Sequence, residues 1–411
     1  MTAPVTVWLD EGEPVPVGQL FSHRRRGSES ATFTYAADYL SRPGACAIDP
    51  AMPLSASPHH TSATRAMFGA FTDAAPDRWG RTLIARREAR RAREQQRAAR
   101  SLGEIDFLLG VRDDLRQGAL RFADAEGTFL APDDDGVPAL TDLPSLLDLA
   151  DRAERDTAVL PDLERLVHAG GSLGGARPKA HVRTSSGALA IAKFPSASHD
   201  TWDVMAWEYV LLRLAHRAGI AVPAHQLLSL AGRNVLIIER FDRTGPQSQQ
   251  RVGYASAMTM LEASDGDQAS YLDIAAVIEE RSDHTTADLE QLWRRMVFSV
   301  MTGNTDDHLR NHGFLHVPGR DAWRLSPAFD VNPDPAAGPR IHATSIDGSD
   351  APSTLAAALA VARDFRLNDS AAAQVIAQVA DAVAAWEAEA RLAGLSSAAI
   401  AAMAPAFDRA P

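Results

Sequence analysis

Hydrophobic and polar residues near the N-terminus alternate with a period of two. Segments 5–10 and 14–20 follow this pattern, and segment 32–36 repeats it after a polar stretch. A period of two places successive side chains on opposite faces of an extended chain, so these segments predict three short strands. Residues 104–123 add a helical turn, a tight turn and a further strand. The first part of the chain therefore predicts a small domain that mixes strands with helices.

Within this first part of the chain, apolar residues recur at helical spacing over residues 61–91. We expect Ser62 or Thr64 to cap this helix and Pro76 to break or restart it. Residues 126–145 are rich in Asp, Gly and Pro, which is typical of a linker.

Beyond this linker, strands are predicted first and helices afterwards. The apolar runs at 188–194 and 235–241 predict strands, and a helical pattern at 202–219 separates them. Residues 286–302 predict a strongly apolar helix that ends at Gly303.

Composition narrows the class of protein. The chain has 411 residues, 45% of them hydrophobic and 23% charged, as in ordinary globular proteins. It has one cysteine, no apolar run near the roughly 20 residues of a membrane span and no signal-peptide pattern, which together predict a cytoplasmic protein without disulfides. The net charge of −12 argues against a broad nucleic-acid surface. Nine arginines between Arg78 and Arg100 leave two interpretations, a solvated helix or a basic strip facing an acidic partner or DNA phosphates.

Two segments in the C-terminal half carry the residue types needed for phosphoryl transfer. Asp306 and Asn311 lie five residues apart in the first, and Asp330 follows an apolar run in the second. Kinase-like enzymes use one carboxylate to orient the substrate hydroxyl, while an amide oxygen and a second carboxylate hold Mg²⁺ against the phosphates. The spacing selects Asp306 as the base, and we expect Asp307 to face solvent.

Three histidines in this region, His308, His312 and His316, are four residues apart. On a helix they would share one face and suggest a zinc site. The Asn-His-Gly sequence at 311–313 and the apolar residues after it instead predict a loop that becomes a strand. We therefore expect His308 to bond the backbone or Asp330 and to fix the loop.

Upstream, a glycine-rich segment at 170–175 precedes two predicted strands. Backbone N–H groups of such a loop can surround phosphates, although a plain hairpin turn is the alternative and the pattern differs from a Walker loop. Lys193 lies in the second, apolar strand, and Glu208 lies on the helix that follows. Kinases pair a strand lysine with a helix glutamate in this order. A solvent-facing lysine and an exposed helix glutamate are the alternatives.

Six segments together resemble HipA-type serine/threonine kinases, the toxins of a bacterial toxin–antitoxin class. They are GGSLGGARPK, IAKF, WEYVLLRLAHRAGI, IIERFDR, GNTDDHLRNHGFL and LSPAFDVNP. The resemblance is strong over residues 165–335 and looser near the N-terminus. The sequence departs from eukaryotic kinases, because TDDH and FDVN stand where those enzymes have HRD and DFG.

This resemblance implies an α+β fold in which successive parts of the chain form separate domains. The expected parts are an N-terminal HipA-like α+β subdomain at 1–125, the linker at 126–145, a kinase-like, β-rich nucleotide-binding lobe at 146–245 and a mainly helical C-terminal lobe at 246–411.

ATP and Mg²⁺ are the implied cofactors, and each candidate residue receives a role. Asp306 would be the catalytic base, supported by Lys193 and His308, while Asn311 and Asp330 would hold Mg²⁺. The implied nucleotide-binding residues are Leu173, Gly174, Gly175 and Lys179 in the phosphate loop, Lys193 with Glu208, and Glu239 and Phe241 beside the adenine. Ser172 would be autophosphorylated, and the added charge would eject the loop and switch the enzyme off.

The implied substrate is a serine or threonine of a protein, with an aminoacyl-tRNA synthetase as the family's typical target, and its phosphorylation would arrest translation. The implied partner is a HipB-like helix-turn-helix antitoxin that connects the kinase to operator DNA. Two further hypotheses stay open at this point, namely a small-molecule kinase of the aminoglycoside or sugar type and a catalytically silent, antitoxin-binding regulator.

Overall fold

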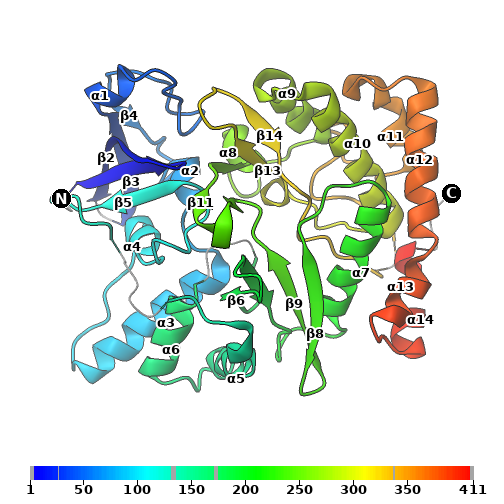
Figure 1. Cartoon of the computed structure of the whole chain (residues 1–411), viewed down its shortest axis with the longest axis horizontal. Coiled ribbons are helices and arrows are strands. Elements are labelled where there is room, and N and C mark those ends of the chain that lie inside the picture. The colour runs from blue at the N-terminus through cyan, green and yellow to red at the C-terminus, as the bar shows by residue number, and fades with distance from the viewer. Residues whose placement is uncertain (1–3, 26, 131–135, 171–174, 337, 408–411) are drawn as a thin grey trace. The chain divides into compact units, whose positions relative to one another are not determined.

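A computed structural model describes residues 4–25, 27–130, 136–170, 175–336 and 338–407 (Figure 1). The chain divides into two compact units, and each is described by itself. The first unit comprises residues 1–199, 242–255 and 315–321, and the second comprises 200–241, 256–314 and 322–411. Helices alternate with antiparallel strand pairs along the chain, which confirms the predicted α+β class. The predicted domain boundaries near residues 125, 145 and 245 stay predictions.

A five-stranded antiparallel sheet in the order β4-β3-β2-β1-β5 forms the N-terminal part of the first unit. Its strands are β1 (Val5–Asp10), β2 (Pro14–Arg25), β3 (Ser28–Tyr35), β4 (His59–His60) and β5 (Leu120–Ala123). Buried and partly exposed side chains alternate along β3 and the start of β1, as the period of two predicts. The buried face contributes Val7, Leu20, Phe33 and Phe122 to the core.

The helices of this unit are α1 (Ala37–Leu40), α2 (Gly69–Asp73), α3 (Arg78–Glu94), α4 (Glu104–Leu109), α5 (Leu143–Glu154) and α6 (Leu160–His168). The helix predicted over residues 61–91 starts later than expected. Residues 61–68 form no helix, so the prediction of a cap at Ser62 or Thr64 is wrong. Asp77, directly after Pro76, caps α3 instead, since its Oδ1 accepts a hydrogen bond of 2.8 Å from the N–H of Gly80.

The arginines of α3 and the turn that follows it are largely paired within the first unit. The ion pairs are Arg81–Glu104, Arg90–Asp156, Arg91–Glu164, Arg97–Glu88 and Arg100–Asp106. Two of them join α3 to the turn before α6 and to α6 itself. This pairing favours the interpretation of the arginine-rich stretch as a structural, partly solvated helix over that of a free basic strip.

Two hairpins complete the first unit. In one, β6 (Lys179–Arg183) pairs antiparallel with β7 (Leu189–Lys193), which places Lys179 directly opposite Lys193. In the other, β10 (Arg243–Thr244) pairs with β11 (Gln250–Arg251).

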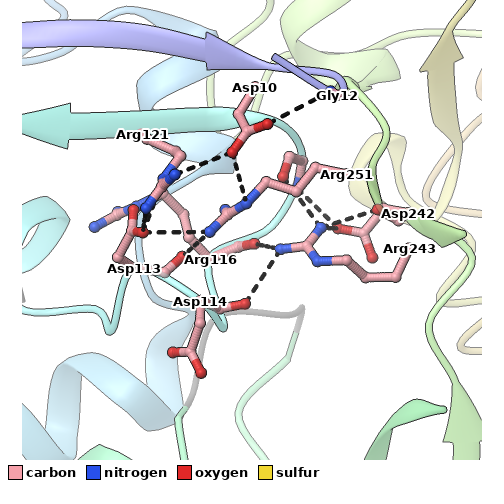
Figure 2. Close-up of polar contacts among 10 residues, drawn as sticks. Asp10, Gly12, Asp113, Asp114, Arg116, Arg121, Asp242, Arg243 and Arg251 are labelled. Atoms are coloured by element: carbon pink, nitrogen blue, oxygen red, sulfur yellow. Dashed lines mark hydrogen bonds and ion pairs between the residues drawn. The ribbon is translucent and has the colours of Figure 1, made fainter. Parts of the chain in front are cut away.

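Buried charges connect the second of these hairpins to the N-terminal sheet (Figure 2). Arg251 donates a 2.7 Å hydrogen bond to the carbonyl of Asp113, and the Asp113 carboxylate also accepts from Arg121 at 2.5 Å. Arg243 donates to the carbonyl of Gly118 at 3.1 Å and to the Asp242 carboxylate at 2.9 Å. Burial makes unpaired charges costly, so this network ties residues 242–251 to the turn before β5.

Helices dominate the second unit (Figure 1). They are α7 (Val204–Arg217), α8 (Ala257–Met260), α9 (Tyr271–Arg281), α10 (Thr285–Thr302), α11 (Leu355–Ala360), α12 (Asp369–Val383), α13 (Trp386–Leu392) and α14 (Ser397–Phe407). Its strands include the antiparallel pair β8 (His225–Leu230) and β9 (Arg233–Glu239) together with β14 (Trp323–Leu325), while β12 (Tyr254–Ser256) and β13 (Gly313–His316) cross the boundary between the units. The helix α10 is the central one, since it packs against α9, α11 and α12 and buries Trp293 and Phe298. Within the described residues, no helix combines the length and apolar character that a membrane crossing requires.

Candidate active site

The predicted apolar helix, α10, directly precedes the segment that contains Asp306 and Asn311, as expected. It ends at Thr302, and Gly303 follows in the left-handed conformation with a φ of 65°. This conformation favours glycine because it lacks a Cβ. The chain then turns sharply, and the N–H of Asn304 bonds the carbonyl of Ser299 at 3.0 Å.

Asp306 and Asn311 lie at the two ends of a compact loop. The side chain of Asp306 is exposed, while Asn311 is buried. The Nδ2 of Asn311 donates a 3.0 Å hydrogen bond to the backbone carbonyl of Asp306. This bond fixes the spacing between the two residues, and it leaves the Oδ1 of Asn311 as the side-chain atom suited to a metal.

Asp307 is buried, so the prediction that it faces solvent is wrong. It is only 5% exposed. Its carboxylate accepts hydrogen bonds from the hydroxyl groups of Tyr271 and Ser299, the latter at 3.3 Å, and lies 3.2 Å from the Nε2 of His312. Burial alone would raise the pKa of Asp307, but His312 and Tyr271 outweigh it and hold that pKa well below its usual range. The two adjacent aspartates thus have opposite environments.

Asp330 is half-buried and has a φ of 56°, a conformation that non-glycine residues seldom adopt. The ring of the preceding residue, Phe329, lies 5.4 Å from the ring of Phe241, measured between centroids. Backbone conformations of this kind at non-glycine residues are frequent at functional sites.

Hydrogen bonds join the Asp330 segment to the Asp306 segment. The N–H of Asn332 donates to the Oδ1 of Asn304 at 3.1 Å. The N–H of Asp334 donates to the carbonyl of Gly303 at 3.0 Å, and the hydroxyl of Thr305 donates to its carboxylate at 3.1 Å. The second unit therefore brings together the segments that carry all three residues predicted for base and metal.

His308 adjoins these residues, and its backbone takes part in the loop. Its N–H bonds the carbonyl of Asp306 at 3.0 Å, and its carbonyl accepts from the N–H of Asn311 at 2.8 Å. The buried Nδ1 of its ring has no hydrogen-bond partner among the described residues, so that nitrogen does not make the expected bond to the backbone or Asp330.

Other predicted nucleotide-binding residues occupy both units. Lys193 ends β7 in the first unit and is half-buried, and Glu208 is buried on α7 in the second. Glu239 ends β9, and Phe241 follows it. The pairing of Lys193 with Glu208 stays a prediction.

Lys179 and Gly175 belong to the first unit, and the rest of the predicted phosphate loop, Ser172, Leu173 and Gly174, lies outside the described residues. Lys179 is buried, and its ammonium group bonds the carboxylate of Asp77 and, at 3.2 Å, the carbonyl of Gly175. This ion pair gives Lys179 a structural role beside the nucleotide-binding role predicted for it.

A zinc site receives no support from the structure. Across the described ranges, no three His, Cys, Asp or Glu side chains are grouped so that they could hold a metal ion. His316 instead lies 2.7 Å from the carboxylate of Glu11 in the first unit. Mg²⁺ needs fewer protein ligands, because phosphates and water complete its shell, and the oxygens of Asn311 and Asp330 are the type it prefers.

The sequence analysis missed two features of the site. It did not identify Asp77 as a helix cap and ion-pair partner, and it did not predict that Asp307 is buried. An aspartate between a proline and a helical pattern is a cap signal that could have identified Asp77. The partners of Asp307 come from α9, α10 and the residue after Asn311, and no local pattern connects these positions.

Family models match both parts of the chain. The model for the HipA-like C-terminal domain matches residues 171–386, and the model for the HipA N-terminal domain matches residues 5–104.

Several known proteins resemble the chain, including the following three. It is 30% identical over 153 residues to the candidate kinase Y4dM of Sinorhizobium fredii, a match that spans 34% of this chain and 36% of that protein. It is 29% identical over 143 residues to a candidate kinase of Haemophilus influenzae, spanning 31% and 41% of the two chains. The fold resembles that of HipA in the Shewanella oneidensis complex of HipA, HipB and operator DNA, with a TM-score of 0.64, 14% identity and coverage of 98% of this chain and 95% of that one. The C-terminal family model alone covers more than half of the 411 residues, and the chain therefore belongs to the HipA family.

Proposed function

We propose that the chain is an ATP- and Mg²⁺-dependent serine/threonine protein kinase that acts as a HipA-like toxin. The observation that carries this proposal is the joining of the Asp306–Asn311 loop to the Asp330 segment within one unit. Both relatives named above are described as candidate kinases, which supports the same activity.

Each residue would act through its position. The exposed carboxylate of Asp306 would accept the proton of the substrate hydroxyl. Asn311 and Asp330 would hold Mg²⁺, which neutralises charge on the phosphates when bound. The remaining proposed roles are phosphate binding by Leu173, Gly174, Gly175, Lys179 and Lys193, orientation of Lys193 by Glu208, and adenine contact by Glu239 and Phe241.

The proposed substrate is a translation protein such as an aminoacyl-tRNA synthetase. The proposed partner is a HipB-like antitoxin, because the Shewanella oneidensis HipA of similar fold was solved with HipB and operator DNA. The net charge of −12 is consistent with DNA contact made through such a partner rather than by a broad surface of this chain.

Autophosphorylation of Ser172 is proposed as the inhibitory switch. Phosphate would add nearly two negative charges to a loop that should cradle the phosphates of ATP. Mass spectrometry after incubation with ATP and Mg²⁺ should find phosphate on Ser172, and phosphate found only elsewhere would remove this switch.

Radiolabelled ATP added to a cell lysate with the purified protein tests the proposed function. We expect labelled protein bands with the wild-type chain and none with Asp306→Ala or Asp330→Ala, because base and metal ligand are then lost. Label in small molecules alone would indicate a small-molecule kinase. Unchanged labelling by both variants, or no labelling by the wild-type chain, would overturn the proposal.

A further inference from the structure

A buried polar cluster lies beneath the candidate catalytic loop. We define the Asp307 cluster as Tyr271, Ser299, Asn304, Asp307 and His312, all of them at most 7% exposed. Its members come from α9, α10 and the segment that follows α10, so it connects two helices to the candidate catalytic loop.

Donors converge on the Asp307 carboxylate. Tyr271 and Ser299 donate through hydroxyl groups, and the Nε2 of His312 lies at an ion-pair distance of 3.2 Å. Both oxygens of a carboxylate only accept hydrogen bonds. An amide would replace one of these oxygens with an NH₂ group, which donates and would face the same hydroxyl and imidazole groups. The site is therefore specific for an ionised aspartate rather than for any side chain of its shape.

One route leads from Asp307 to the proposed base and metal ligand. Asp307 follows Asp306 directly, and His312 follows Asn311 directly. The contact between Asp307 and His312 therefore closes the loop at both ends, through the residue that follows each functional position. This contact acts together with the bond from Asn311 to the carbonyl of Asp306.

A second route leads from Asp307 to the other proposed metal ligand. Ser299 donates to Asp307 and accepts a 3.2 Å hydrogen bond from the Nδ2 of Asn304. The Oδ1 of Asn304 in turn accepts from the backbone N–H of Asn332, two residues beyond Asp330. All donors in this chain of bonds point toward Asp307, so the bonds polarise one another.

We infer that Asp307 is a positioning residue that sets the Asp306–Asn311 loop and the Asp330 segment relative to each other. It touches neither substrate nor cofactor in this role, and the inference rests on the proposed kinase function. The burial of Asp307 suits this role: Asp307 is buried and accepts hydrogen bonds from two hydroxyl groups, whereas Asp306 is exposed.

Steady-state kinetics of Asp307→Asn tests the inference. We expect kcat to fall about 10- to 100-fold, because displacements near 1 Å in a catalytic group have effects of this size, while KM for ATP changes less than about twofold. The double variant D307N/H312Q should lose no more than the worse single variant, since the two residues act as a unit. Asp381→Asn, on an exposed position of α12, is the matched control and should keep wild-type kinetics.

Hydrogen exchange on the nucleotide-free chain gives a readout that does not depend on activity. Asp307→Asn should speed amide exchange in peptides covering residues 303–311 and 329–334, and Ser299→Ala should do so mainly in 329–334. Exchange in α12 should stay unchanged in both. Uniformly faster exchange in all peptides would show a merely structural role and would overturn the inference.

Asp306→Ala distinguishes a failure of the positioning role of Asp307 from a failure of the proposed kinase function. If Asp306→Ala is inactive and Asp307→Asn keeps wild-type kcat, the positioning role is lost and the kinase function stands. If Asp306→Ala stays active, the proposed function itself is lost. Should Asp307→Asn fail to fold, Tyr271→Phe removes one donor from the same carboxylate, and wild-type kcat with unchanged exchange in that variant would overturn the inference.

Discussion

The carboxylate of Asp242 accepts a 2.8 Å hydrogen bond from the backbone N–H of Gly118, although 124 positions separate the two residues. The same carboxylate pairs with Arg243 (Figure 2). The guanidinium of Arg243 also donates a hydrogen bond to the carbonyl of Gly118. The side chains of Asp242 and Arg243 are 3% and 2% exposed. The residues that follow Phe241 are therefore anchored to the N-terminal part of the chain by buried charges.

Asp242→Ala should lower the free energy of unfolding by about 3–5 kcal/mol, because it leaves the Arg243 charge buried without its carboxylate. Urea denaturation of both proteins measures this difference. Arg363→Ala is the matched surface control, since the Arg363–Asp369 pair is 81% and 88% exposed and such a pair is worth about 1 kcal/mol or less. Equal effects of the two substitutions would contradict the structural role of the buried pair.

Gly303→Ala should destabilise the second unit by about 1–2 kcal/mol from the left-handed backbone conformation alone. A Cβ at this position would also lie 3.0 Å from the Cζ of Arg340 and 3.2 Å from the carbonyl oxygen of Ala406. Gly394→Ala has a comparable φ of 81° and nothing within 4 Å of the added Cβ. Thermal unfolding should therefore show a larger loss for Gly303→Ala than for Gly394→Ala, and the reverse order would contradict this explanation.

Stability should fall as the pH rises above neutrality because of His316. Burial by itself would lower the pKa of His316, but interactions with Cys46 and Glu11 outweigh it and raise the pKa to about 10. A raised folded-state pKa gives stability that is fully present below the unfolded value near 6.5 and is lost as the pH rises toward 10.

Between pH 6.5 and 9 we expect a loss of about 3 kcal/mol, measured by urea denaturation at each pH. His316→Gln should remove most of this dependence, while His216→Gln, at an exposed position of α7, should retain it. An unchanged pH profile in His316→Gln would show that the protonated imidazole does not stabilise the fold.

Lys179 and Lys193 are cross-strand partners and should respond differently to substitution. Lys179→Met should lower the free energy of unfolding by about 3–5 kcal/mol, because Asp77 is left buried without its ammonium partner. Lys193→Met should abolish phosphorylation and change stability by less than about 1 kcal/mol, since Lys193 is half-buried and its proposed role is in ATP binding. A stable Lys179→Met variant with a raised KM for ATP would instead favour direct phosphate contact by Lys179.

Local patterns were sufficient for much of the fold. The alternation at residues 5–10 predicted β1, the apolar run at 235–241 predicted β9, and the sequence before Gly303 predicted α10 with its end. These predictions were correct because strand and helix periods depend on neighbours a few residues apart. The helix start predicted at Ser62 or Thr64 was wrong, since the first helix of this stretch, α2, begins at Gly69. The break or restart predicted at Pro76 was correct, since α2 ends before Pro76 and α3 begins directly after Asp77.

The sequence by itself determined the residue types and spacing of the candidate site, including Asp306, Asn311 and Asp330. Only the tertiary structure decided which of two adjacent aspartates is exposed. Spacing selected Asp306 as the candidate base, but the expectation that Asp307 faces solvent was wrong, because Asp307 is buried. The environment of a side chain depends on the residues that pack against it. Here Tyr271, 36 positions away from Asp307, donates a hydrogen bond to its carboxylate, and no local pattern in the sequence predicts that contact.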